Sequence, residues 1–481
     1  MPSDLAVRSD LSLGGGFIAP GETYDTVGRD VASIAFDHPL GRRWWIAFAA
    51  AMGLTGLLVA SLTALFIEGV GIWGNNIPVT WALDIVSYDW WIGIASGGLL
   101  VSGTLLLLGL EWRSAVNRMA ETVAVISVAA AGIYPIIHLG RPWLFYWNLP
   151  YPNTLLLWPQ FKSPLVWDEF DILGILVISV SFWYVGMLPD LATLRDRAVE
   201  RSLAANSDAT LGAAGKGILR AQLYGIAALG WRGSAVHWER WRQTYRTLAL
   251  LGVLVVITLQ TGAAVMFAGT VEPGWHDTLL PASYLFAAVF EGVGIVSAVI
   301  VMLRSVLRLH ALITTRHITV LAKLLLALAA VNIYCYGAEL YGTALHGDSF
   351  ERAVSVRRFF GPHAWAAWSI LLCALLPVQL FWVPALRRSP GLLAIVGLLI
   401  GVGMFGDHFM VIVVTLQHDF LPSMAHPYAI NLWELATFGG TVGLFLVLLL
   451  LAVRTLPVVS ILELRRLQID ERAPSISAQW F

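Results

Sequence analysis

Ten long apolar runs are the feature of this 481-residue chain that most limits its fold. A segment in lipid must satisfy its own backbone hydrogen bonds, and each run is about twice the length of a barrel strand and able to cross about 30 Å of hydrocarbon as a helix. The sequence therefore predicts an all-α, polytopic membrane protein with about ten transmembrane helices. The expected spans are approximately 44–67, 90–110, 119–138, 169–188, 246–269, 280–303, 317–341, 364–385, 390–415 and 430–454.

Composition excludes several other classes of protein. The chain is 58% hydrophobic and 13% charged, whereas soluble domains carry about 25% charged residues, so a soluble enzyme is excluded. Thirty basic and 31 acidic residues nearly cancel, and this balance gives no field for nucleic acid. The two cysteines, Cys335 and Cys373, form no CxxCH motif and no thiolate set for an iron–sulfur cluster or zinc. We expect any redox metal to lie on a partner chain or to use histidines.

The distribution of positive charge predicts the orientation in the membrane. Between the spans, 23 lysines and arginines fall on the side of the two termini and five on the other side, so both termini are expected in the cytoplasm. Spans 2 to 5 and 6 to 9 suggest an internal duplication. A tryptophan- and arginine-rich part of the long cytoplasmic loop favours an interfacial helix, with a docking surface as the alternative. The expected segments are a cytoplasmic extension 1–43, helices 1–4 within 44–188, a cytoplasmic loop 189–245, helices 5–10 within 246–454, and a cytoplasmic tail 455–481.

Ionisable side chains inside spans are costly and are therefore candidate site residues. With about 1.5 Å of rise per residue, several of them fall into one layer near the outer face. That layer holds His138, Asp168, Asp171, Asp407 and His408. Glu291 falls near the midplane, whereas Glu121 and Lys323 lie toward the cytoplasmic side.

Structural explanations compete with function at these positions. Asp168 and Asp171 precede an apolar run and suit helix capping, and His138 could bond a carbonyl or reach the interface. Lys323 suits a snorkelling lysine. For Glu291, the alternative is a packed hydrogen bond to a neighbouring helix.

The outer layer favours quinol chemistry. Oxidation of a hydroquinone removes two electrons and two protons, and its hydroxyls need a base near neutral pH. A histidine and a carboxylate at the two ends of the ring suit this task. Haem b is a weaker alternative because His138 and His408 both lie near one face and no mid-helix pair exists.

Several motifs resemble one membrane-protein family. They are Glu111-Trp112-Arg113-Ser114, His138-Leu139-Gly140-Arg141-Pro142-Trp143, Ser163-Pro164-Leu165-Val166-Trp167-Asp168 and Leu188-Pro189-Asp190-Leu191-Ala192. Together they resemble the larger polysulfide-reductase/NrfD-type membrane subunits of alternative complex III, the ActC type. The dense match covers under a fifth of the chain.

The resemblance implies a quinol-binding subunit with two four-helix bundles, flanking helices and no haem, iron–sulfur cluster or metal of its own. It implies that His138 and Asp168 are the catalytic, quinol-binding residues; Arg141, Trp143 and Asp171 are added because they are close in sequence. Menaquinol is the expected quinol.

The same resemblance implies a respiratory complex in a bacterial inner membrane. The expected partners are a periplasmic iron–sulfur protein, multihaem and monohaem cytochrome c subunits, a second NrfD-type subunit, small membrane subunits and lipids. Proton translocation is a further hypothesis, with a path through Glu291, Asp407, His408, Glu121 and Lys323.

Two other functions remain open. One is a non-catalytic NrfD-type anchor, against which the presence of both His138 and Asp168 argues. The other is a secondary transporter, which the midplane Glu291 would allow. A transporter would not explain the matched motifs together with the lack of a redox group.

Overall fold

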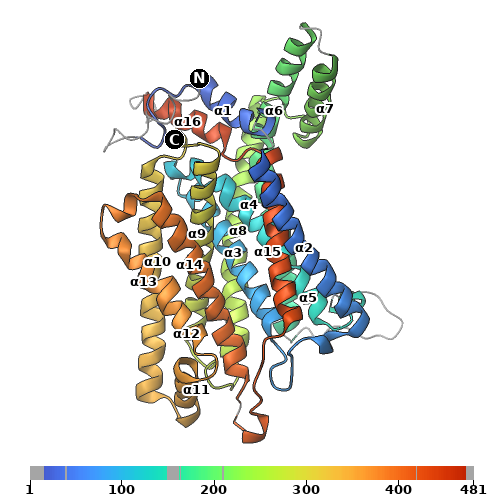
Figure 1. Cartoon of the computed structure of the whole chain (residues 1–481). Helices are drawn as coiled ribbons and strands as arrows, with labels where there is room; N and C mark the ends of the chain where they lie inside the picture. Colours follow the sequence, from blue (N-terminus) through green and yellow to red (C-terminus); the bar gives the residue numbers. More distant parts are fainter. Residues whose placement is uncertain are drawn as a thin grey trace.

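The computed structural model of the chain describes residues 16–37, 41–148, 162, 164–207, 211–418 and 420–472. These residues form helices and loops, with no strand among them (Figure 1). The α-helices are α1 (Tyr24–Asp37), α2 (Arg42–Glu68), α3 (Leu83–Leu107), α4 (Asn117–Ala131), α5 (Ile133–His138), α6 (Pro164–Ser207), α7 (Leu211–Ala227), α8 (Ala235–Ala268), α9 (Leu280–Val306), α10 (Thr315–His346), α11 (Ser349–Phe360), α12 (Trp365–Ser369), α13 (Leu376–Val378), α14 (Pro390–Phe409), α15 (Leu432–Thr455) and α16 (Ile461–Arg472). Short 3₁₀ or π segments join several of them, among them η2 (Glu111–Ala115), η3 (Pro142–Asn148), η4 (Ile370–Leu375) and η7 (Met410–Val414).

Ten helical stretches in the described part of the chain are long and apolar enough to cross a membrane, which confirms the predicted all-α, polytopic class. Two spans begin well before their predicted starts. Helix α8 begins at Ala235, eleven residues before the predicted span at 246, and α3 begins at Leu83, seven residues before the predicted span at 90. Asp84 and Asp89 lower the hydropathy of these first turns, although both side chains are buried by neighbouring helices.

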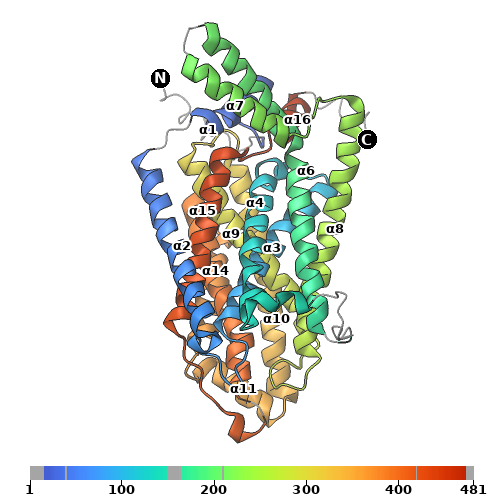
Figure 2. The ribbon, with the colours of Figure 1, turned by 90° about the vertical axis from the view of Figure 1, so that its right-hand side faces the viewer.

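The spans pack as two four-helix bundles with two flanking helices, as expected. The first bundle contains α3, the α4–α5 pair, α6 and α8, and the second contains α9, α10, the α12–α13 segment and α14. The flanking helices α2 and α15 pack along each other beside the first bundle (Figures 1 and 2). Helices α3 and α9 form the main contact between the two bundles.

Two glycines allow α3 and α9 to touch. A Cβ atom on Gly97 would lie 2.7 Å from the Ala288 carbonyl oxygen and 2.7 Å from Gly292 Cα. A Cβ atom on Gly292 would lie 2.6 Å from Gly97 Cα. Membrane helices approach this closely only where small residues let the backbones meet. We call this point the glycine crossing.

The predicted cytoplasmic loop 189–245 is largely helical. Helix α6 continues through Pro189 to Ser207 and pairs with α7, and this hairpin projects beyond the bundles (Figure 1). The tryptophan- and arginine-rich part forms the first turns of α8 instead of a separate interfacial helix. Ser234 caps α8, accepting a hydrogen bond from the His237 N–H at 3.2 Å. Trp241 Nε1 donates to the Val185 carbonyl of α6 at 2.8 Å, so this ring packs on protein.

Helices α1 and α16, the first and last helices of the described residues, pack together at one end of the bundles (Figure 1). We call this the terminal end and the opposite one the distal end. Helix α5 and the first turns of α3, α6 and α9 lie at the distal end (Figures 1 and 2).

Candidate functional site

The histidine that ends α5 is paired with a buried carboxyl group. His138 Nδ1 lies 2.5 Å from Asp84 Oδ2, in the first turn of α3. The Asp84 side chain is 1% exposed and that of His138 is 25% exposed. The other Asp84 oxygen accepts a hydrogen bond from the Ala82 N–H at 3.3 Å. A carboxylate that accepts from Nδ1 keeps the imidazole proton there and leaves Nε2 free to take up a proton.

The carboxyl groups at the start of α6 lie beside the same part of α3. Tyr88 and Asp89 of α3 are within electrostatic range of the Asp168 carboxylate. Tyr88 lies four residues after Asp84, so the side chains of Asp84 and Tyr88 share one face of α3. The first two turns of α3 therefore contact His138 and lie within electrostatic range of Asp168.

The three residues added by sequence proximity occupy different surroundings. Arg141 is exposed. Trp143 is 56% exposed and stacks on Phe66 of α2, with ring centroids 6.2 Å apart. Asp171 is partly buried and faces α8, where its Oδ2 would be 3.8 Å from a Cβ on Gly262. Arg141 and Trp143 thus lie on the surface of the distal end, whereas Asp171 lies between α6 and α8.

A second group of titratable side chains is buried between the bundles. We call it the central acid cluster: Asp89, Tyr284, Glu291, Asp407 and His408, all buried. His408 Nε2 lies 3.1 Å from Glu291 Oε2, and His408 Nδ1 lies 3.8 Å from Asp89 Oδ2. The Tyr284 hydroxyl donates a hydrogen bond to that same Asp89 oxygen. Asp407 is within electrostatic range of Asp89 and Glu291.

The first bundle has a neutral pair in the corresponding place. Gln260 Nε2 of α8 donates a hydrogen bond to Ser96 Oγ of α3 at 2.8 Å. Ser96 and Glu291 each precede the glycine of their helix at the glycine crossing. Helices α8 and α14, which carry Gln260 and His408, are each the last span of their bundle. This correspondence supports an internal duplication in which the second bundle carries titratable groups at this position.

Glu121 belongs to a separate set of charges near the terminal end. Arg118 Nη1 donates to Glu121 Oε2 at 2.9 Å, and Arg118 Nη2 donates to Asp190 Oδ2 at 2.8 Å. The three side chains are each 1% exposed. Glu121 Oε1 also accepts hydrogen bonds from Tyr245 at 2.7 Å and Ser102 at 2.8 Å. With both oxygens occupied, Glu121 is held as a buried ion-pair partner.

The same charges attach α16 to the bundle. Arg113 Nη1 lies 2.5 Å from Glu463 Oε1 of α16, and the Leu462 N–H donates to Asp190 Oδ1 at 3.0 Å. We call the whole set the terminal-end charge cluster: Arg113, Arg118, Glu121, Asp190, Tyr245 and Glu463.

Lys323 joins neither cluster among the described residues. It is exposed on the surface of α10, the position expected of a snorkelling lysine. Of the five residues assigned to a proton path from sequence, the structure brings Glu291, Asp407 and His408 together and leaves Glu121 and Lys323 elsewhere.

Sequence reasoning missed the residues that α3 contributes. Asp84, Tyr88 and Asp89 lie before the predicted start of span 2, where the sequence predicts a loop outside the membrane. Tyr284 was missed because an uncharged tyrosine in an apolar run carries no signal of its own. A usable signal for α3 was the four-residue spacing of Asp84 and Tyr88, which continues the helical period of the span backwards.

No group of three or more His, Cys, Asp and Glu side chains in the described ranges has the arrangement of a metal site. A ten-span helical protein with buried titratable groups between two bundles is the class that this fold and site define.

The chain belongs to the polysulphide reductase NrfD family, whose model matches residues 72–418. NrfD-type chains are membrane subunits of quinol-linked reductase complexes. One similar protein is a selenate reductase subunit of Mesobacillus selenatarsenatis, 22% identical over 86% of this chain and 93% of its own length. Another is a putative dimethyl sulfoxide reductase membrane subunit of Halobacterium salinarum, 23% identical over 74% of this chain and 75% of its own.

Proposed function

We propose that this chain is the quinol-oxidising membrane subunit of an alternative complex III, with its quinol site at the distal end. The observation that carries the proposal is the His138–Asp84 pair. A partly exposed imidazole, oriented by a buried carboxylate, has the arrangement of a general base. The match of its HLGRPW motif to the ActC type adds to this.

The proposed chemistry is proton removal coupled to electron transfer. His138 Nε2 takes the proton of one quinol hydroxyl, and Asp168 takes the proton of the other. Two electrons leave to the iron–sulfur clusters of a partner subunit, and the product is the quinone. Asp84 acts as a positioning residue, because it holds the histidine tautomer that can accept a proton.

The wider assignment follows from the sequence and stays a proposal. We assign both termini to the cytoplasm of a bacterial inner membrane, which places the distal end at the periplasmic side. Menaquinol is the proposed substrate. The proposed partners are the iron–sulfur protein, the cytochrome c subunits and the second NrfD-type subunit.

The central acid cluster is proposed as a proton path between the bundles. It lies deeper than the His138–Asp84 pair, and its His408–Glu291 contact crosses from α14 to α9. The pair is fully buried, with Glu291 0% and His408 3% exposed. Protons that reach it would therefore be shielded from lipid.

The test is quinol-dependent cytochrome reduction by the purified complex. We expect His138→Ala and Asp168→Asn each to lower turnover by about 100-fold or more, because each removes a proton acceptor. The amount of every subunit and the cofactor load must match those of the unaltered complex. His276→Ala is the matched control: it removes an exposed distal-end histidine that contacts the Thr270 carbonyl, and turnover should not change. Equal turnover in all variants would show that quinol is oxidised elsewhere.

The two similar proteins favour a second candidate function. Both are named as subunits of reductases, so this chain could supply electrons from quinol to a reductase of that type. In both cases quinol is oxidised at this site, and only the partner subunits that accept the electrons differ. Purification of the complex with c-type haem supports alternative complex III, whereas a haem-free complex with a molybdenum-containing subunit supports the reductase.

A further inference from the structure

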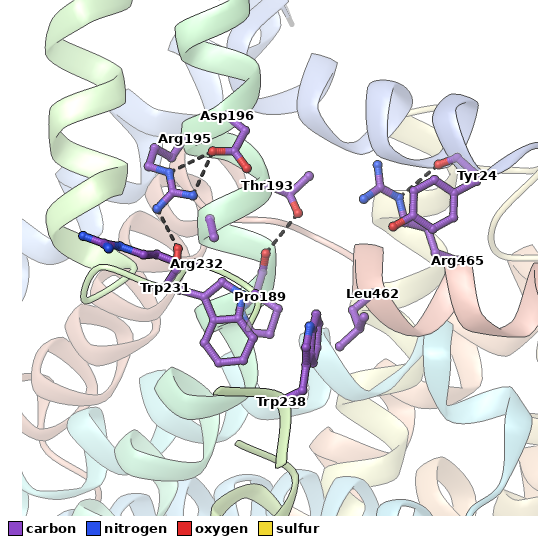
Figure 3. A pocket seen from close by; sticks show the side chains of 12 residues that line it. Tyr24, Pro189, Thr193, Arg195, Asp196, Trp231, Arg232, Trp238, Leu462 and Arg465 are labelled. Atoms are coloured by element: carbon purple, nitrogen blue, oxygen red, sulfur yellow. Dashed lines mark hydrogen bonds and ion pairs between the residues drawn. The ribbon is translucent and has the colours of Figure 1, made fainter. Parts of the chain in front are cut away.

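A basic pocket opens at the terminal end, far from the proposed quinol site (Figure 3). It has a volume of about 150 Å³ and lies between α1, α6, the loop before α8, α8 and α16. Its charged lining residues are Arg195, Arg232, Arg465 and Asp196, so arginines outnumber acids by three to one.

The pocket has two unlike sides. Figure 3 shows Pro189, Trp231 and Trp238 on the side toward the bundles, with Leu462 nearby. The Trp231 and Trp238 rings are 4.9 Å apart and nearly perpendicular. Tryptophan is typical of the headgroup zone of a membrane, because its ring is apolar and its N–H is polar. The apolar side therefore suits the glycerol and upper acyl region of a lipid.

The arginines keep donors available after their protein contacts are made. Arg465 Nε donates to the Tyr24 carbonyl at 3.0 Å, and its guanidinium lies 4.2 Å from the Tyr24 ring centroid. Its two Nη groups have no acceptor among the described residues. Asp25 is within electrostatic range of Arg465 but is hydrogen-bonded to Arg197.

The other two arginines, Arg195 and Arg232, differ in their contacts with the protein. Arg195 donates to the Trp231 carbonyl at 2.8 Å and to Asp196, which shapes the rim of the pocket. Arg232 is exposed, and its side chain has no partner among the described residues. Guanidinium groups bind phosphate oxygens well because their donors form a planar fork.

We infer that this pocket binds the phosphate of a monoanionic phospholipid of the phosphatidylglycerol class. Basic pockets between membrane-spanning helices at the headgroup level bind anionic lipids. The bound lipid would connect α1 and α16 to α6 and α8, because residues from all four helices line the pocket. This inference does not depend on the proposed quinol chemistry.

The test measures lipid binding to the purified, delipidated complex by thermal-shift titration. The probes are dioleoylphosphatidylglycerol, dioleoylphosphatidylcholine and inorganic phosphate. We expect phosphatidylglycerol to raise the melting temperature at lower concentration than phosphatidylcholine. Arg465→Gln should weaken this effect roughly fivefold, and adding Arg232→Gln should weaken it roughly fivefold again. The control is Arg240→Gln, which removes an exposed arginine of α8 outside the pocket and should change nothing.

Three results would overturn the inference. Equal effects of the two lipids would show that the phosphate charge is not recognised. An equal effect of inorganic phosphate would assign the pocket to a free anion. Unchanged binding in the double variant would place the lipid elsewhere. If Arg465→Gln lowers the melting temperature without lipid, Arg232→Gln alone decides the question, since that exposed side chain has no structural contact to lose.

Discussion

The terminal-end charge cluster and the central acid cluster are both buried, but they neutralise their carboxyl groups differently. Near the terminal end, Arg118 lies between Glu121 and Asp190 and contacts both. Between the bundles, Glu291 instead contacts His408. An arginine carries a fixed positive charge, whereas a histidine exists in neutral and charged forms. The first cluster is therefore a set of fixed ion pairs, and the second pairs its carboxyl groups with a side chain that has no permanent charge.

Buried hydrogen-bonding atoms without a partner occur in both clusters. In the central acid cluster they are Glu291 Oε1 and His408 Nδ1, and in the terminal-end charge cluster they are Arg113 Nε, Arg118 Nε and Glu463 Oε2. Buried polar atoms without partners are costly and often mark function. Because both clusters contain such atoms, neither burial nor an unpaired atom separates a candidate proton path from a structural ion-pair cluster. The type of partner that contacts the carboxyl groups is what differs between the two.

The largest expected effect is the loss of stability when Arg118, the central cation of the terminal-end charge cluster, is removed. Arg118→Met removes the cation that contacts both Glu121 and Asp190 and leaves these carboxyl groups buried, and we expect the folded state to lose about 3–5 kcal/mol of stability. Thermal unfolding in detergent measures this. Arg240→Met, an exposed position at the same end, should change stability by less than about 0.5 kcal/mol. An Arg118→Met protein as stable as the unaltered one would show that this cluster does not hold the helices.

The positioning role that we propose for Asp84 gives the next largest expected effect. Asp84→Asn can no longer hold the Nδ1 proton of His138 as a carboxylate does, so turnover should fall about 100-fold. The KM for quinol should change little, because Asp84 is 1% exposed and orients the histidine without touching quinol. Parallel losses of quinol affinity and stability, with no separate fall in kcat, would indicate a purely structural role.

A smaller effect is expected in the central acid cluster. Glu291→Gln keeps a hydrogen-bonding group beside His408 but removes the titratable one. We expect turnover to fall roughly tenfold and stability to change by less than about 1 kcal/mol, with fewer protons moved per electron. Gln260→Ala is the control in the first bundle, since it disrupts the neutral Ser96 pair. An unchanged proton-to-electron ratio in Glu291→Gln would remove the cluster from the proton path.

The smallest effect concerns Lys323. Because this side chain is exposed on α10, Lys323→Gln should alter turnover by less than about twofold and stability by less than about 0.5 kcal/mol. The same assays measure both quantities. A large fall in turnover would show that Lys323 takes part in proton transfer. It would contradict the proposal that the central acid cluster alone forms the proton path.

The spans could be predicted from the sequence because hydropathy averages over about 20 residues and tolerates local errors. That averaging also caused the main omission. The two aspartates in the first turns of α3 made these turns look like a loop, although neighbouring helices bury them. The arginine-rich start of α8 lies outside its predicted span for the same reason, because its charges lower the average hydropathy.

The candidate site was only partly accessible from the sequence. His138 and Asp168 could be placed near one face by counting residues along helices, because depth depends only on helical rise. The His138–Asp84 contact joins positions 54 residues apart, and no local period reports it. The same is true of the contact between Glu291 and His408, 117 residues apart, which depends on how two helices of the second bundle pack.

The glycine crossing also has a mechanical consequence. Helices α3 and α9 meet backbone to backbone there, and α8 with α9 and α3 with α14 add further contacts between the bundles. If the bundles tilted about the crossing, displacement would grow with distance from it. Glu291 is adjacent to the crossing and would scarcely move. Asp84 lies thirteen residues from Gly97 along α3, or roughly 20 Å, so a tilt of about five degrees would displace it by roughly 2 Å relative to the second bundle. In such a tilt Gly97 and Gly292 would be the pivot, with the deep acid at the axis and Asp84 on the lever arm.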